Sequence, residues 1–546
     1  MDFDTDVLIV GGGSAGCVLA ARLSEDPRCR VTLLEVGGDG RGWVVETPAA
    51  TGLMLPRKLN NHAFETVPQP GLGGRRGYQP RGRALGGSSA INGMIYIRGQ
   101  REDYDQWAAL GNPGWGYADL LPYFRRSEHN EQFDDAFHGQ GGPLNVAALR
   151  TGNPFQRIFL DAGREAGYPV REDFNGAQQE GVGIFQVTQK NGERWSAARA
   201  YLFPHLADGS RPRSNLTVRT GVRVRRLLVA QGRAVGAECE PVAGGPVLRI
   251  RAREVLLCAG ALQSPHLLML SGIGPAAQLQ AHGVTPVVDL AGVGEHLQDH
   301  PDFILAYRAP SLDLMGLSPA GLWRLWREIG RYRQARVGAV TSNYAEAGAF
   351  LRSRPEVATP DLQLHFILGI AEDHARKVHA AHGYSCHVCL LRPRSRGSVR
   401  LGSADPTAAP RIDPGFYQDP RDLEDMVAGV RLTRRLMDMP ALRARRHRRH
   451  QEEMFSAHAQ SDEALREQLR ARSDSCYHPA GSCRMGPDPA RGDVVDARLR
   501  VHGVDGLRVV DASIMPTLVS GNTNAPVIAI AEKAADLIRE DWAARA

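Results

Sequence analysis

The first forty residues constrain the fold most strongly, because they place a glycine-rich turn between two apolar runs. A short apolar run at residues 6–10 leads into glycines with the spacing G-x-G-x-x-G, which are Gly11, Gly13 and Gly16. A helical pattern follows, and a second apolar run at residues 31–34 ends at Glu35. The order strand, tight turn, helix, strand and acid is typical of a dinucleotide-binding unit.

Each residue of this motif has a physical task. Gly11 permits the tight turn, Gly13 lets a pyrophosphate approach the backbone, and Gly16 lets the helix pack closely on the strand. The helix N-terminus offers unpaired N–H groups and a partial positive charge to phosphates. Glu35 lies where a carboxylate can accept hydrogen bonds from ribose hydroxyls. A glycine-rich surface turn is the structural alternative, and the motif alone does not separate FAD from NAD(P).

Length and composition predict an ordinary enzyme with more than one domain. A chain of 546 residues exceeds the size of one hydrophobic core, so two or three domains are expected. No stretch approaches eighteen consecutive apolar residues, and we therefore expect no transmembrane helix. The first strand begins near Asp6, which leaves no room for a cleavable signal peptide. These features predict a cytoplasmic protein whose cysteines are reduced.

The net charge of +6 is carried almost entirely by arginine. No basic face interleaved with aromatic residues is visible, so a nucleic-acid partner is not expected. The densest basic run lies at residues 443–450 and is predicted to be a solvated helix face. Peripheral association of this run with anionic lipid, at the inner face of a membrane, is the alternative.

Cys386 and Cys389 form a C-x-x-C pattern inside a strand-like run. A redox pair normally opens a helix, so we expect buried structural thiols and no metal site here. A redox pair, or a zinc half-site completed by Cys476, His478 or Cys483, is the alternative.

Two further segments carry long signatures. Consecutive glycines and serines followed by an asparagine suit a loop whose N–H groups and hydroxyls contact a ligand. In the first segment these residues are Gly82, Arg83, Gly86, Gly87, Ser88, Ser89, Asn92, Tyr96, Gly99 and Asp105. The second segment is residues 260–274. Together with the N-terminal motif, they make the chain resemble the glucose–methanol–choline (GMC) family of flavoprotein oxidoreductases over nearly its whole length. This resemblance disfavours a nicotinamide enzyme.

The resemblance implies an α/β plus α+β fold, in which an FAD-binding Rossmann-like domain is interleaved with an antiparallel-sheet substrate-binding domain. The FAD-binding domain is expected at residues 1–155, 210–302 and 475–546, and the substrate-binding or cap domain at 156–209 and 303–474. Periodicity predicts strands at 216–228, 254–260, 362–369 and 384–391. It predicts helices at 117–127, 153–166, 322–334, 423–438 and 527–539.

His478 is the candidate general base. It lies in a loop rich in proline and glycine, and imidazole has an unperturbed pKa of about 6.5, near working pH. The resemblance implies that His478 faces the flavin and removes the hydroxyl proton of an alcohol. At the position of Asn522 the family has His or Asn, and we expect Asn522 to donate to the developing alkoxide. A structural histidine and a turn or capping asparagine are the alternatives.

The cofactor implied by the resemblance is FAD, which accepts a hydride from the alcohol carbon at its N5 atom. Some relatives attach FAD through a histidine at the position of Ile91, so non-covalent binding is expected here. Carried over by position, the cofactor-binding residues are Gly11, Gly13, Gly16, Glu35, Gly87, Ser88, Asn92, Val222 through its backbone, Asp511, Ala512 and Thr523.

The substrate is predicted as a class. The chain most resembles the choline dehydrogenase and bacterial alcohol dehydrogenase branch, where a carboxylate aligned with Glu346 faces the cation of choline. Tyr344 and Phe366 are candidates for the aromatic walls such a cation needs. Relatives with this carboxylate also oxidise uncharged alcohols, so an aliphatic, aryl or polyol primary alcohol is preferred over choline.

Electrons are expected to pass to a quinone, a redox protein or oxygen. An alcohol oxidase that forms hydrogen peroxide and, from another class, a hydroxynitrile lyase of the same fold are the alternatives. The sequence does not predict the natural alcohol, the acceptor or the oligomeric state.

Overall fold

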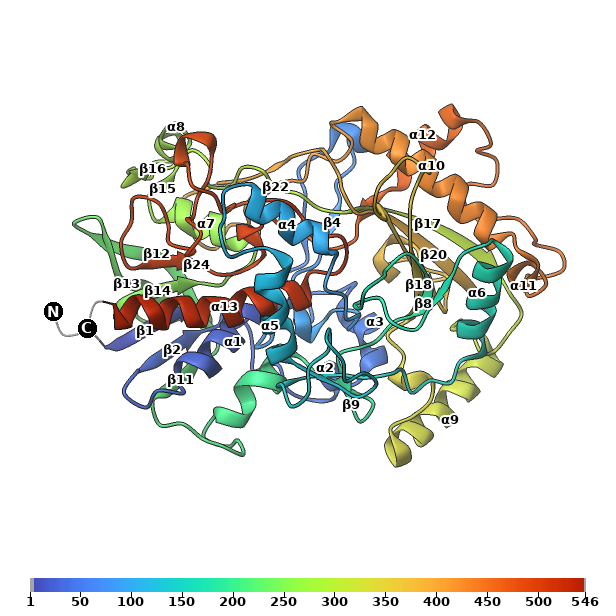
Figure 1. The fold of residues 1–546 in the computed structure, drawn as a ribbon, viewed down its shortest axis with the longest axis horizontal. Helices are drawn as coiled ribbons and strands as arrows, with labels where there is room; N and C mark the ends of the chain where they lie inside the picture. Colours follow the sequence, from blue (N-terminus) through green and yellow to red (C-terminus); the bar gives the residue numbers. More distant parts are fainter. Residues whose placement is uncertain (1–3, 545–546) are drawn as a thin grey trace.

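The computed structural model describes residues 4–544 and contains two seven-stranded sheets, one at each side of Figure 1. Strand β1 (Thr5–Val10) occupies the middle of the first sheet. Its Val7, Leu8 and Ile9 are fully buried, because both faces of a parallel sheet are covered.

The first sheet is parallel at its centre. Its parallel strands are β11 (Leu216–Arg219), β2 (Val31–Leu34), β1, β14 (Leu248–Leu257) and β24 (Leu507–Val509). Two antiparallel strands extend it, β13 (Arg233–Pro241) and β12 (Val222–Ala230). Helices α1 (Ser14–Leu23), α13 (Asn524–Ala543) and α5 (Tyr117–Ser127) run beside one another on this part of the molecule (Figure 1). Arg22 of α1 and Glu532 of α13 form a bidentate ion pair at 2.9 Å.

The second sheet is antiparallel except for one edge pair. Its order is β23 (Asp474–Ser475), β17 (Pro301–Arg308), β20 (Gly383–Leu390), β19 (Leu362–Ile367), β18 (Ala345–Leu351), β8 (Gly181–Ile184) and β7 (Val170–Arg171). One face packs in a core with α6 (Pro154–Glu165), α10 (Pro420–Met437), α11 (Pro440–Arg443) and α12 (Asp462–Arg472). Because side chains alternate along a strand, the residues between these core positions point to the opposite face.

The remaining helices and strand pairs lie outside these two sheets. The helices are α2 (Trp43–Glu46), α3 (Thr51–Met54), α4 (Arg101–Ala109), α7 (Gln263–Leu270), α8 (Ala276–Ala281) and α9 (Pro319–Ala335). The strand pairs are β3 (Phe64–Glu65) with β4 (Tyr78–Gln79), β5 (Glu128–Asn130) with β6 (Leu144–Val146), β9 (Gln189–Lys190) with β10 (Glu193–Arg194), β15 (Ile273–Gly274) with β16 (Val288–Asp289), and β21 (Ser398–Arg400) with β22 (Arg411–Asp413). Among the described residues, no helix is both long and apolar enough to cross a membrane.

The predicted fold class is confirmed, with a Rossmann-like parallel sheet and an antiparallel sheet built from alternating parts of the chain. The predicted domain boundaries stay a prediction. Two local predictions are wrong. The run 216–228 is two strands in different places, because Gly221, with a φ of 66°, turns the chain between them. The basic run is not a helix face, since α11 ends at Arg443 and turns follow.

Candidate active site

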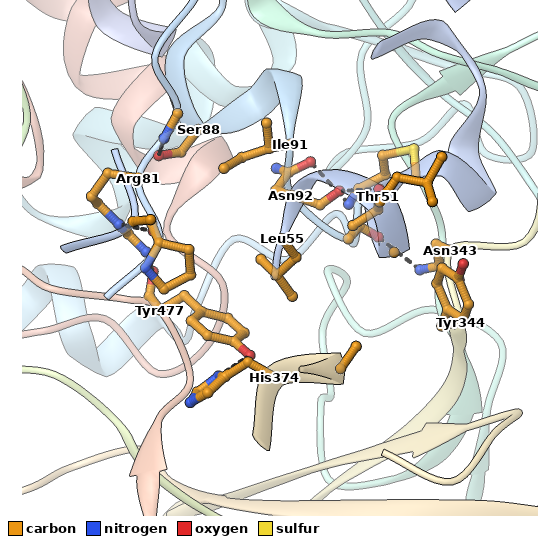
Figure 2. Close-up of a pocket in the computed structure, with 18 of the residues that line it drawn as sticks. Thr51, Leu55, Arg81, Ser88, Ile91, Asn92, Asn343, Tyr344, His374 and Tyr477 are labelled. Carbon is orange, nitrogen blue, oxygen red and sulfur yellow. Dashed lines mark hydrogen bonds between the residues drawn. The ribbon is translucent and has the colours of Figure 1, made fainter. Parts of the chain in front are cut away.

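One cavity of about 1550 Å³ is lined by residues from both sheets and their loops. The predicted cofactor residues that line it are Gly11, Gly13, Glu35, Gly87, Ser88, Asn92, Val222, Asp511, Ala512 and Thr523. The predicted catalytic and substrate residues that line it are His478, Asn522, Tyr344 and Glu346. Figure 2 shows this cavity with Arg81, Tyr477 and His374 on one side and Asn343 and Tyr344 on the other. Gly16 and Phe366 are not part of the lining.

The glycines of the first motif leave room beside the backbone. A Cβ on Gly11 would lie 2.5 Å from the carbonyl oxygen of Cys258, and one on Gly16 would lie 2.0 Å from that of Gly11. A Cβ on Gly13 would instead have no neighbour closer than 3.8 Å, so the backbone is open to the cavity there. Gly11 and Gly16 therefore permit the turn and the helix packing, and Gly13 permits the approach of a ligand.

Glu35 closes this turn from the end of β2. Its two carboxylate oxygens accept the N–H groups of Gly12 at 2.9 Å and Gly37 at 2.7 Å. Burial raises the pKa of Glu35 to about 7. Since a carboxylate can accept about four hydrogen bonds, capacity remains for ribose hydroxyls.

The second glycine-rich segment lies against the first. Gly87 adopts a φ of 54°, and a Cβ there would lie only 2.6 Å from the Cα of Gly13. The Ser88 hydroxyl accepts the N–H of Gly82 at 3.2 Å. The Asn92 amide oxygen accepts a hydrogen bond from the buried Arg194 guanidinium at 2.8 Å, which fixes the orientation of this side chain toward the cavity.

Two helix N-termini meet at the same end of the cavity. The Ser14 hydroxyl at the start of α1 donates to the side-chain oxygen of Asn524 at the start of α13, at 2.8 Å. Both residues line the cavity, as does Thr523, which precedes α13. The partial positive charges of both helices therefore add there, which suits an anionic cofactor.

Asp511 and Val222 contribute differently. Asp511 follows β24 and accepts the Gly260 N–H at 2.9 Å and the Ser513 N–H at 2.8 Å. These bonds join the loop that follows β14 to the loop that follows β24. The Val222 N–H already donates to the Glu35 carbonyl at 2.9 Å. A backbone contact between Val222 and adenine would therefore have to use the Val222 carbonyl.

His478 is buried, and its ring contacts polar side chains. Its Nδ1 lies 3.0 Å from the Nδ1 of His300, whose Nε2 lies 3.1 Å from the carbonyl oxygen of Leu391. A carbonyl only accepts, so His300 carries its proton on Nε2, and its Nδ1 accepts from the Nδ1–H of His478. The His478 Nε2 therefore carries no proton, and its lone pair can accept a hydrogen bond. Burial lowers the pKa of His300 to about 3, which keeps that ring neutral.

Asn522 completes the chain from the other side. Its side-chain nitrogen donates to the Nε2 of His478 at 3.2 Å, and its oxygen accepts from the Gln363 amide at 3.1 Å. The structure thus brings the two predicted catalytic side chains together, although they lie 44 residues apart. Burial is the main reason that the pKa of His478 lies well below its usual value, and the nearby His300 lowers it further.

The backbone around His478 is strained and held from beneath. Tyr477 adopts a φ of 71°, which is costly for a residue with a side chain. Its hydroxyl lies 2.6 Å from the Nδ1 of His374, a contact that Figure 2 shows. The buried Asp299 accepts the N–H of His478 at 2.9 Å. These contacts fix the position of the His478 ring.

Glu346 is buried in the substrate side of the cavity. One carboxylate oxygen accepts from Thr151 at 2.9 Å and from Gln156 at 2.7 Å, while the other has no hydrogen bond of good geometry, although the nearby Ser342 hydroxyl lowers the pKa of the group. Burial raises the pKa of Glu346. Tyr344, two residues earlier, also lines the cavity, and its hydroxyl donates to the Ala49 carbonyl at 2.6 Å.

The assignment of Phe366 to a substrate wall is wrong. On β19, Leu362, Leu364 and Phe366 face the helical core, where Phe366 stacks on Phe159 at 4.7 Å between ring centroids. Because side chains alternate, the neighbouring His365 and Ile367 face the cavity instead.

Cys386 and Cys389 lie on β20, and their side chains face opposite sides of the sheet because side chains alternate along a strand. Cys386 packs in the helical core, whereas Cys389 faces the other way and donates to Asp302 at 3.1 Å. Both are buried thiols, but they do not form a C-x-x-C site. The ligand atoms of Cys389, His365 and Cys476 do lie within 4.8 Å of one another. Burial raises the pKa of the Cys389 thiol, which holds its proton, and the absence of a metal stays a prediction.

Sequence reasoning missed His300 and Gln363. His300 directly precedes Pro301 in a loop that contains Gly292 and Gly294, and this position was the available signal. Gln363 alternates with the apolar residues of β19, which places it on the cavity face.

Comparisons with known proteins identify the family of this chain. Two GMC oxidoreductase family models match residues 5–302 and 393–531. An "alcohol dehydrogenase [acceptor]" of Pseudomonas putida is 44% identical over 98% of this chain and 95% of that protein. Mouse mitochondrial choline dehydrogenase is 43% identical over 97% of this chain and 89% of that protein.

Solved structures show the same likeness. The crystal structure of pyridoxine 4-oxidase from "Mesorbium loti" has a TM-score of 0.87 at 34% identity, and covers 98% of this chain and 99% of that one. A formate oxidase of Aspergillus oryzae, described for its FAD modification, has a TM-score of 0.89 at 27% identity and covers 98% of each chain. The open backbone at Gly13, the free acceptor capacity of Glu35 and the paired helix N-termini fit FAD as the cofactor. The chain therefore belongs to the GMC oxidoreductase family of FAD-dependent enzymes that act on CH–OH groups.

Proposed function

We propose that this protein oxidises primary alcohols to aldehydes, with the Nε2 of His478 as the general base. The observation that carries the proposal is the directed hydrogen-bond chain from Leu391 through His300 to His478. Because this series of hydrogen bonds ends at the Leu391 carbonyl, the Nε2 of His478 carries no proton. Its lone pair points toward Asn522 and the cavity. A lone pair there can accept the hydroxyl proton of an alcohol.

In addition to the base, the reaction needs a partner that keeps the protonated His478 hydrogen-bonded and a donor that stabilises the alcohol oxygen. As His478 takes the proton at Nε2, its Nδ1–H continues to donate to the neutral His300, so the charged ring stays hydrogen-bonded. The Asn522 N–H donors face the same point and stabilise the developing negative charge on the alcohol oxygen, an effect worth a few kcal/mol when a donor is preorganised. FAD, when bound, supplies the hydride acceptor.

The lining of the cavity supports an apolar alcohol. Beside charged residues such as Asp313, Arg324 and Glu346, the lining includes twelve large aliphatic or methionine side chains between residues 312 and 378. They are Leu312, Leu314, Met315, Leu317, Leu322, Leu325, Ile329, Val340, Ile367, Leu368, Ile370 and Val378. Such a wall favours binding of an alkyl chain, at roughly 0.8 kcal/mol for each buried methylene group. We therefore propose aliphatic primary alcohols as the substrate class and a quinone-type acceptor as the electron acceptor.

Choline is the second candidate, and Glu346 is the observation that favours it. One oxygen of this buried carboxylate has no hydrogen bond of good geometry, so a cation beside it would be stabilised. With Phe366 facing the core, however, Tyr344 is the one predicted aromatic wall that remains in the cavity.

An anaerobic substrate panel tests the function. The purified holoenzyme is mixed with straight-chain primary alcohols of increasing length, with benzyl alcohol, with glycerol and with choline, and flavin absorbance is followed at about 450 nm. We expect bleaching with alkanols, with kcat/KM rising with chain length. Readmitting oxygen or adding a quinone then identifies the acceptor by peroxide formation or by quinone reduction. If none of these alcohols bleaches the flavin, the proposed function is wrong.

A further inference from the structure

Helix α9 exposes most of its apolar side chains. The exposed fractions are 72% for Trp326, 59% for Trp323, 57% for Leu322, 49% for Leu325 and 39% for Ile329. We call these five residues the α9 face. Four of them recur at the spacing i, i+3, i+4 and i+7, so they form one continuous stripe. In Figure 1, α9 stands at the lower right edge of the molecule.

The helix is held without using this face. Its buried residues are Glu328 and Tyr332. Ser318 caps its N-terminus by accepting the Gly321 N–H at 3.0 Å, and Glu328 accepts the Ala339 N–H at 2.8 Å. Because neither buried residue belongs to the α9 face, that face stays largely exposed.

The charges around the face are positive. Arg327 and Arg333 are exposed on α9, and Arg327 stacks on Trp323 at 4.8 Å. Two carboxylates on or beside the helix are paired with other arginines of α9. Glu328 forms an ion pair with Arg331 at 2.9 Å, and Asp313 pairs with Arg324 at 3.0 Å. The partner that complements this surface is therefore apolar and anionic.

The active-site cavity reaches the surface at the same place. Leu322, Leu325 and Ile329 line the cavity and are also exposed. Leu317 and Val378 share both properties, with exposed fractions of 50% and 70%. A ligand leaving the cavity along these residues would pass directly over the α9 face.

This chemistry fits a bilayer better than a protein. A stripe of leucine and tryptophan flanked by arginine is the pattern of helices that lie in the membrane interface, where tryptophan settles at headgroup level. A second copy of the chain fits poorly. A two-fold symmetric contact places the same patch on both sides, which would bring the arginines of two helices together.

We propose that the α9 face docks this protein on anionic membranes, with the cavity mouth turned toward the lipid. The docking itself is independent of the proposed function. The orientation of the cavity mouth has a consequence that rests on the proposed function. Apolar alcohols and quinones dissolved in the membrane would enter the cavity without crossing water. The arginine heads would contact lipid headgroups while the apolar stripe enters the acyl boundary.

Vesicle binding tests the proposal. The holoenzyme is floated with vesicles of phosphatidylcholine alone or of phosphatidylcholine mixed with phosphatidylglycerol, whose anionic headgroups attract basic segments. The variant Trp323→Gln/Trp326→Gln removes the apolar contribution, and neither residue lines the cavity. We expect the wild type to partition at least about tenfold more strongly to the anionic vesicles, and the variant to lose at least about tenfold of that binding.

A matched control carries Leu110→Gln and Val247→Gln, two exposed apolar residues outside α9, with exposed fractions of 49% and 47%. It should bind as the wild type does. Equal binding by wild type and the tryptophan variant, or no vesicle binding by the wild type, would overturn the proposal, as would a dimer in solution that the tryptophan variant dissociates. Oxidation of a short, water-soluble alcohol should be unchanged in both variants. Failure of that reaction in the wild type would count against the proposed function and leave the docking result intact.

Discussion

The Nδ1 atoms of His478 and His300 lie 3.0 Å apart, and the proton between them belongs to His478. This follows from one backbone carbonyl, that of Leu391, which can only accept from His300. The relationship decides which ring nitrogen of His478 is basic. It also makes His300 a positioning residue, because it acts on the reaction only through His478.

Replacing His300 tests that role. In His300→Phe the acceptor for the His478 Nδ1–H is lost, so the ring can turn or change tautomer. We expect kcat/KM for alcohols to fall at least about tenfold while FAD content stays unchanged. In His300→Gln a side-chain oxygen can accept the same N–H, and much of the activity should return. If His300→Phe and His300→Gln lose activity equally, a hydrogen-bond acceptor for the His478 Nδ1–H is not required for the reaction.

The pH dependence tests the environment of His478. The imidazole acts as a base only when unprotonated, and burial lowers its pKa well below 6.5. The basic form therefore persists to a lower pH than for a free imidazole. We expect kcat/KM for flavin reduction to stay level as pH falls from about 8 through 6.5, with the decline beginning below that value. A decline of kcat/KM centred at pH 6.5 or above would show that the pKa of His478 is not lowered by burial.

Gly87 tests the cofactor cradle. In Gly87→Ala the new Cβ meets the Cα of Gly13 at 2.6 Å, and the residue must keep a φ of 54°. We expect purified protein with at least about tenfold less FAD per chain, measured by flavin absorbance after denaturation. Gly93→Ala is the control, because Gly93 also lines the cavity but its Cβ would have no neighbour within 4 Å. Equal FAD content in the two variants would mean that the two glycine-rich segments are not closely packed.

Glu346 separates the two substrate candidates. Glu346→Gln removes the negative charge but keeps a polar side chain of the same size. For alkanols we expect a change in kcat/KM of less than about threefold, because no charge is present in the substrate. For choline we expect a loss of at least about tenfold, since a buried cation would lose its counter-charge. An alkanol-specific loss would place Glu346 in the reaction itself.

Local features of this protein are predictable from its sequence, whereas contacts between distant residues are not. The turn at Gly11, Gly13 and Gly16 was predictable because its chemistry depends on neighbours in sequence. Phe366 shares its phase on the strand with Leu362 and Leu364, so the alternation of this strand already indicates that Phe366 faces the core. The partnership of His300 and His478 was not readable, because 178 residues separate them and only the tertiary fold joins them.

The same contrast applies to α9. Its apolar spacing predicted a helix at residues 322–334, close to the observed Pro319–Ala335. An amphipathic pattern normally indicates a face that packs on the protein core. Here the pattern gave no sign that the stripe faces solvent, which depends on the tertiary contacts of the helix.

The most direct test of the central claim is the anaerobic rate of flavin reduction in His478→Ala beside the wild type, with the best alkanol from the substrate panel. We predict full FAD retention and a rate at least about 10²-fold lower, because the chain then has no base at this position. Asn522 would still donate to the alcohol oxygen, so binding of the alcohol should change much less than the rate. Reduction at the wild-type rate by FAD-loaded His478→Ala would contradict the account.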